Sequence, residues 1–182
     1  MIKQKTPRAI RDEWRKFYRE MFRMDVDFSR VVIPKDSGGY DWEIMVAQNI
    51  TIYEIIRMCR RRFQFFVGID LGGIIHERNP EQNYAVRIMP RWDATEIEKE
   101  KGLGQKYITL IERLIFELKL CDRIGSPLDR NAYTTCLGSL DKDGNSPRVL
   151  ASLGDNEVCV ISSSPIFRMP RSYGEYSRSV IT

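Results

Sequence analysis

The stretch TLIERLIFELKLCDRIG, residues 109–125, has the strongest structural pattern in the chain. Thr109 and Glu112 have the spacing of a capping box, in which each side chain bonds the backbone N–H of the other residue. Apolar side chains then recur at helical spacing as far as Cys121. Gly125 is typical of the residue that ends a helix. The sequence therefore predicts a helix from residue 109 to residue 125, and the other elements are placed around it.

Two more helices are predicted nearer the N-terminus. Thr6 and Pro7 form an N-cap followed by proline at the first helical position. Apolar residues then recur at spacings of 4, 3 and 4, which predicts an amphipathic helix from about Pro7 to Arg23. Thr51 caps a second helix that runs to about Arg62, with isoleucines inward and arginines outward.

Strand-like runs occur between and after these helices. In the first half they are predicted at residues 28–34, 40–47, 63–69 and 84–89. In the second half they are predicted at residues 134–137, 148–153 and 158–162, with turns at 141–145 and 154–156 and a last strand at 177–181. The three runs before the last strand predict an antiparallel meander.

The predicted fold class is α+β, a mixed sheet with about three helices and a C-terminal antiparallel meander. A length of 182 residues fits one domain. Within it, residues 1–92 and 107–182 are divisible into two lobes joined by a charged connector over 93–106.

Composition excludes several protein classes. Hydrophobic residues make up 42% and charged residues 30%, as in an ordinary globular domain. No run approaches the roughly 18 apolar residues of a membrane-spanning helix. The charged start, without an apolar segment, predicts no secretory signal, so we expect a cytoplasmic protein that does not bind membranes.

The ligands of a metal site or a catalytic centre are sparse. The four cysteines are isolated and no CxxC pair occurs, so we expect reduced, buried thiols, no metal site and no cofactor. His76 is the only histidine, and we assign no catalytic residue, although a Cys136–His76 pair stays an alternative. Glu112 and Glu117 point about 140° apart around their helix, so they do not form a carboxylate pair, and we expect Glu117 to face solvent.

Positive charge gathers in three places. Residues 1–24 hold eight basic and three acidic residues, so their net charge of 8 − 3 = +5 exceeds the +4 of the whole chain. Residues 57–62 hold four arginines. Residues 167–173 interleave arginine with rings, a composition that suits stacking on nucleic acid. Arginine binds phosphate with two parallel hydrogen bonds. The predicted nucleic-acid-binding residues are Arg8, Arg11, Arg15, Arg19, Arg60, Arg61, Arg62, Arg168, Arg171 and Tyr173.

These observations favour a non-catalytic accessory protein that binds DNA or RNA through arginine-rich surfaces. The alternative is a protein-interaction or self-associating module that uses Trp14, Phe17 and Met21, because aromatic residues and methionine are enriched at interfaces. An enzyme is the third hypothesis, because carboxylates from distant segments can assemble an active site.

The second half of the chain also resembles a known family. The similar segments are ITLIERLIFELK at 108–119, Pro127-Leu128-Asp129, Cys136-x-Gly138-Ser139, residues 143–149 and the final RSVIT. They resemble a family of small bacterial and metagenomic proteins without an established function, in which His-Leu-Asp stands where this chain has Pro127-Leu128-Asp129. The resemblance implies a shared fold and carries over no site residue.

Overall fold

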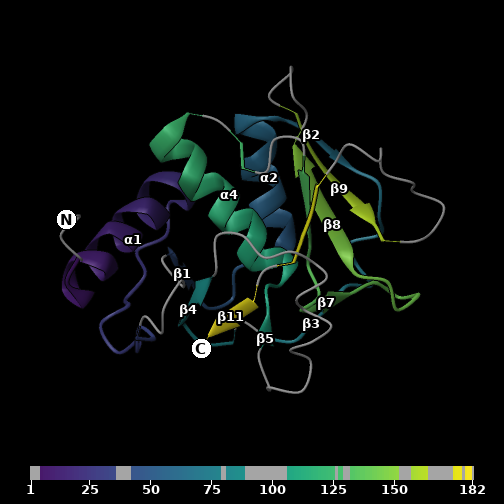
Figure 1. Ribbon diagram of the computed structural model, residues 1–182. Helices are drawn as coiled ribbons and strands as arrows, with labels where there is room; N and C mark the ends of the chain where they lie inside the picture. Colours follow the sequence, from purple (N-terminus) through teal and green to yellow (C-terminus); the bar gives the residue numbers. More distant parts are fainter. Residues whose placement is uncertain are drawn as a thin grey trace.

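The computed structural model describes residues 5–35, 42–78, 81–88, 106–125, 127–128, 132–151, 157–163, 174–177 and 179–181. Three helices lie among them: α1 (Pro7–Phe22), α2 (Ile52–Arg62) and α4 (Leu110–Ile124). Figure 1 shows α2 and α4 side by side at the centre, with one sheet to the right of them, another below, and α1 on the far left.

Each helix begins where the sequence predicts a cap. The Thr6 hydroxyl accepts a hydrogen bond from the Ala9 N–H at 3.3 Å, and α2 and α4 both begin with complete capping boxes at Thr51 and Thr109. Gly125 ends α4 in the left-handed conformation, with φ of 69°. The predicted helices are therefore confirmed, together with the residues that start them.

The larger sheet has five strands in the order β10-β6-β8-β9-β2. Their bounds are Gly174–Ser177, Ala132–Thr135, Pro147–Ala151, Glu157–Ser162 and Gln64–Val67. Strands β6, β8 and β9 are antiparallel neighbours, as the predicted meander requires. Strands β10 and β2 join its two edges in parallel, so the sheet is mixed.

The second sheet has four antiparallel strands in the order β1-β4-β11-β5. Their bounds are Trp42–Val46, Tyr84–Ile88, Ser179–Ile181 and Lys106–Tyr107, and a separate ribbon pairs β3 (Ile75–His76) with β7 (Ser139–Leu140). Both larger sheets take strands from residues 1–92 and from residues 107–182, so the two ranges share hydrogen-bonded sheets. The α+β class with a mixed sheet is confirmed.

Three predictions for the first half need correction. Residues 28–34 form no strand, because buried Phe28 and Val31 anchor an irregular segment to the core while Val32 is 81% exposed. The predicted buried strand at 63–69 is an edge strand, in which Phe66 is 54% exposed. The segment between this strand and residue 84, for which no strand is predicted, contains β3. Of the predicted connector over 93–106, residues 93–105 lie outside the described residues, and Lys106 belongs to β5.

The core lies between the helices and the sheets, and α1 is joined to it by a buried tyrosine. The Tyr18 hydroxyl donates to the Met45 carbonyl at 2.9 Å and accepts from the Ala47 N–H at 3.1 Å. Burial raises the pKa of this phenol, which therefore stays neutral and keeps both bonds. Tyr18 thus fixes α1 against β1, which leaves the opposite side of the helix to solvent.

Candidate nucleic-acid interface

Two of the α1 arginines share a single carboxylate. Arg15 donates to both oxygens of Asp25, from Nε at 3.0 Å and from Nη2 at 3.2 Å, and Arg19 donates to the same group at 2.9 Å. These bonds lower the pKa of Asp25 to about 2. One negative charge therefore offsets part of the positive charge of this pair.

The other two predicted α1 arginines also have contacts within the chain. Arg11 donates twice to the Val31 carbonyl, at 3.2 and 2.8 Å, and so holds the irregular segment after the helix. Arg8 lies 3.9 Å from Asp12, and both are exposed. Lys16 and Glu20 form a similar exposed pair. The α1 surface therefore offers less free positive charge than its arginine count suggests.

The arginines of α2 are different. Arg57, Arg60 and Arg61 are exposed, and within the described part of the chain no carboxylate pairs with any of them. Arg62, the last predicted residue of this group, lies 3.7 Å from Asp122 at the end of α4. Arg60 and Arg61 lie in the last turn of α2, where the helix dipole favours positive charge, and Arg57 lies one turn earlier.

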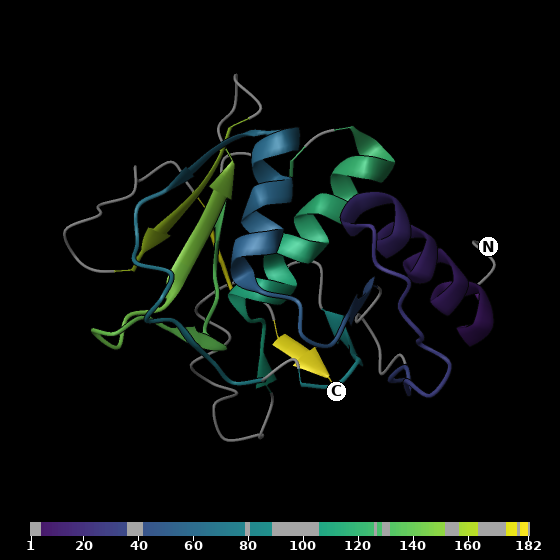
Figure 2. The ribbon, with the colours of Figure 1, turned by 180° about the vertical axis from the view of Figure 1, so that it is seen from behind.

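The same three arginines border a pocket of about 360 Å³, together with Tyr53, Ile56 and Leu71. Five of the six residues belong to α2 and recur at spacings of three and four, so they form one stripe along the helix. Leu71 comes from the turn after β2. Figure 2 shows α2 at the front when the molecule is seen from behind, above β11 and the C-terminus.

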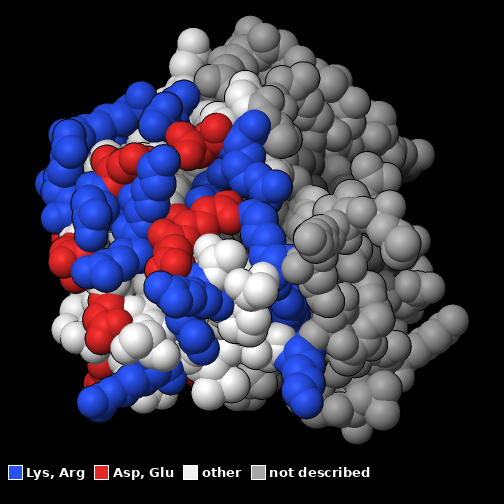
Figure 3. Space-filling model, turned by 90° about the vertical axis from the view of Figure 1, so that its left-hand side faces the viewer, with Lys and Arg blue, Asp and Glu red and all other residues white. Residues whose placement is uncertain are grey.

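Acidic residues lie among the basic residues of α1, α2 and α4. Asp122 lies beside Arg62 at the end of α2, and Glu13 of α1 bonds Lys119 of α4 at 3.3 Å. Figure 3 shows the face that carries α1, where Asp and Glu side chains lie between the Lys and Arg side chains. The predicted Arg168, Arg171 and Tyr173 lie outside the described residues.

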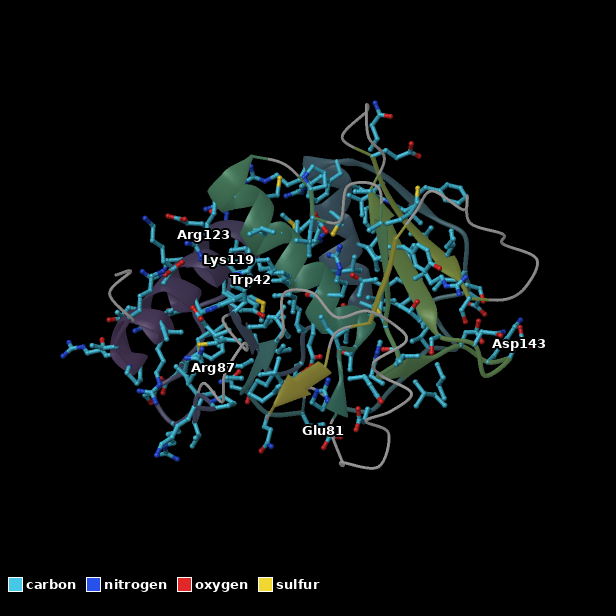
Figure 4. The ribbon with its side chains drawn as sticks, in the orientation of Figure 1. Trp42, Glu81, Arg87, Lys119, Arg123 and Asp143 are labelled. Atoms are coloured by element: carbon cyan, nitrogen blue, oxygen red, sulfur yellow. The ribbon has the colours of Figure 1, made fainter. Side chains whose placement is uncertain are left out.

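The side chains predicted to contact a protein partner are part of the core. Trp14, Phe17 and Met21 are 2%, 3% and 7% exposed, and the Trp14 and Phe17 rings pack edge to face at 5.3 Å. Lys119 lies over both rings, at 5.4 and 5.1 Å from their centroids. Figure 4 shows Lys119 between α4 and α1, where it also bonds Glu13. The prediction that these three form a partner surface is wrong, because the apolar stripe of α1 packs against its own domain.

Two buried carboxylates on α4 have structural partners. Glu112 accepts from Arg78 at 2.5 and 2.6 Å and from the Tyr84 hydroxyl at 3.1 Å, in addition to capping the helix. Arg78 also donates to the Tyr107 carbonyl at 2.6 Å. Burial and the charge of Glu112 raise the pKa of Tyr84. This cluster joins β4, β5 and the start of α4.

The second carboxylate, Glu117, is fully buried, which contradicts the prediction that it faces solvent. It accepts from Arg113 Nη1 at 2.5 Å and from the Leu128 N–H at 2.7 Å. Arg113 Nε also donates to the Thr134 hydroxyl at 3.3 Å. The prediction failed because an Arg–Glu pair four residues apart has the same pattern on a surface as in a core.

His76 pairs with a serine rather than with Cys136. Its Nδ1 lies 2.8 Å from Ser139 Oγ, which also accepts from the Leu110 N–H at 2.9 Å. Burial lowers the pKa of His76, and the charge of Glu112 partly opposes that shift. Ser139 is 1% exposed, so its hydroxyl serves the start of α4 and is closed to a substrate.

Comparison with protein-family models, curated proteins and solved structures found no match to this chain. The resemblance to a bacterial family therefore stays a prediction. Among the described residues, no group of three or more His, Cys, Asp or Glu side chains could hold a metal ion. The helices described above are too short or too polar to cross a membrane.

Proposed function

We propose that the protein binds nucleic acid through the outer face of α2 and does so without catalysis. The observation that carries this proposal is the set of three exposed guanidinium groups, Arg57, Arg60 and Arg61, for which the described residues supply no carboxylate. They border a pocket that also has aromatic and aliphatic walls.

The spacing of these groups suits a phosphate backbone. Arg57 and Arg61 are one helical turn apart, or about 6 Å along the axis, and Arg60 lies between them. Each guanidinium can donate two parallel hydrogen bonds to one phosphate. Phosphate contacts supply most of the affinity in binding that does not depend on sequence, because they release counterions from the nucleic acid.

The α1 arginines are assigned a minor role. Arg15 and Arg19 already bond Asp25, and Arg11 bonds a backbone carbonyl. A phosphate would have to compete with these partners. The α1 helix therefore supplies a control that carries the same residue type.

The test compares two triple variants with the wild type. The α2 variant is Arg57→Gln/Arg60→Gln/Arg61→Gln. The α1 variant is Arg8→Gln/Arg15→Gln/Arg19→Gln, and it removes the same amount of charge. Binding is measured by the fluorescence anisotropy of a labelled 30-nucleotide DNA of mixed sequence at about 50 mM salt, and circular dichroism confirms folding.

We expect the α2 variant to lose about tenfold or more in affinity, because it loses three phosphate contacts, and the α1 variant to lose much less. Equal losses in both variants would contradict a site on α2 and would indicate a response to net charge alone. Absence of binding by the wild type at this salt concentration would refute the proposed function.

A further inference from the structure

Tyr53 lies in the first turn of α2 and its ring faces solvent. It is 59% exposed, although most aromatic side chains of the described residues are buried or half-buried. In the described part of the chain no hydrogen bond engages its hydroxyl. Arg57 follows one helical turn later, so a ring and a cation lie next to each other on the same stripe.

The pocket beside Tyr53 combines an apolar wall with a basic rim. Tyr53, Ile56 and Leu71 supply the apolar wall, while the three α2 arginines supply the charge. The segment that carries Leu71 lies close to Tyr53, because a Cβ added at Gly72 would lie 3.4 Å from the Tyr53 hydroxyl oxygen. A volume of about 360 Å³ is at the lower end of the range for small-ligand sites.

A ligand that joins a planar ring to an anion would match the apolar wall with its ring and the basic rim with its charge. A nucleotide is such a ligand. In a duplex, each base is stacked between its neighbours, and it must be unstacked before a protein can contact its face. In a single strand the face of the base is available, and aromatic side chains stack on it whatever the sequence.

We infer that the α2 surface binds single-stranded nucleic acid, with one base stacked on Tyr53 and the adjoining phosphates on Arg57, Arg60 and Arg61. This inference rests on the proposed function and adds to it the form of the ligand. A duplex would contact the arginines alone, so Tyr53 would contribute little to its binding.

The test uses wild type, Tyr53→Ala and Tyr53→Phe with a labelled 12-nucleotide single strand, as DNA and as RNA, and with the matching 12-base-pair DNA duplex. We expect Tyr53→Ala to weaken single-strand binding by about 5-fold to 150-fold, and Tyr53→Phe to keep it, because stacking needs the ring and not the hydroxyl. Duplex binding should be the same in all three proteins. Binding of either the DNA or the RNA strand in this pattern supports the inference.

The outcomes separate this inference from the proposed function. If Tyr53→Ala binds single strands as tightly as wild type while the α2 triple variant loses binding, stacking on Tyr53 is refuted and the proposed function stands. If Tyr53→Ala weakens single-strand and duplex binding equally, selectivity for single strands is refuted. If the α2 triple variant binds as well as wild type, the proposed function fails and this inference fails with it.

Discussion

Replacing Glu112 by glutamine tests whether its buried charge holds the start of α4 to the second sheet. The carboxylate is fully buried and accepts two hydrogen bonds from Arg78, whose side chain is 10% exposed. Glutamine has nearly the same shape but removes the negative charge and turns an NH₂ group toward the guanidinium. Arg78 would then lose its buried counter-ion and keep only the exposed carboxylate of Glu77, 3.4 Å from its Nη1. Removing one partner of a buried ion pair costs about 3–5 kcal/mol.

We therefore expect Glu112→Gln to lower the free energy of unfolding by about 3–5 kcal/mol. The free energy of unfolding of a domain is about 5–15 kcal/mol, so this loss is a large fraction of the total. Urea denaturation followed by far-ultraviolet circular dichroism measures it. The control is Glu20→Gln, which breaks an exposed pair with Lys16 at 3.8 Å and should cost less than about 1 kcal/mol.

The reasoning is refuted if Glu112→Gln and Glu20→Gln destabilise the protein equally. A second measurement separates charge from packing. Removing the cation as well, as in Arg78→Met/Glu112→Gln, leaves no buried ion unpaired and keeps a side-chain oxygen for the Thr109 cap, so this double variant should be more stable than Glu112→Gln alone.

Three further predictions test other contacts of the fold. Gly138→Ala should lower the free energy of unfolding by at least about 1–3 kcal/mol in urea denaturation, because its Cβ would lie 2.5 Å from the Tyr107 carbonyl oxygen, and no loss would contradict the close backbone approach. His76 has a pKa below 6.5 in the folded protein because of burial, so the unfolded chain binds more protons; wild type should lose stability as pH falls below about 6.5, and His76→Asn should lack that part of the loss. Arg15→Gln/Arg19→Gln should raise the pKa of Asp25 from about 2 toward its ordinary value in a carboxyl NMR titration, and an unchanged pKa would show that the three groups do not interact in solution.

The helices could be predicted because their signals are local. A capping box is complete within four residues, as at Thr51 and Thr109, and the apolar stripe that follows repeats every turn. The meander could be predicted for a similar reason, since its strands are neighbours in sequence and are separated by turn residues. In the turn before β8, Asp141 Oδ1 accepts from the Asp143 and Asn145 N–H groups at 3.0 and 2.8 Å.

The order of the strands could not be predicted, because it depends on contacts between distant residues. Strand β2 pairs with β9 across about ninety residues, and no turn signal records that pairing. The burial of Glu117 has the same cause. Its partner Arg113 is local, but the β6 strand and the 127–128 segment that cover the pair come later in the chain.

The sequence indicates part of the proposed site. Arg60 and Arg61 were assigned from their clustering, but the α1 arginines could not be told apart from them, because Asp25 folds back onto Arg15 and Arg19 only in the structure. Tyr53 was missed. Its spacing of four from Arg57 was a usable signal, since residues four apart on a helix share a face.

The salt dependence of binding tests the central claim most directly. Each phosphate neutralised on a single strand contributes about −0.7 to the slope of log affinity against log salt concentration. If the three α2 arginines each contact a phosphate, the slope of the α2 triple variant should be less steep than that of wild type by about 2. The slope of the α1 triple variant should stay close to that of wild type. If the wild-type slope is flat, or if the α2 and α1 variants reduce it equally, the arginines of α2 are not the phosphate-binding surface.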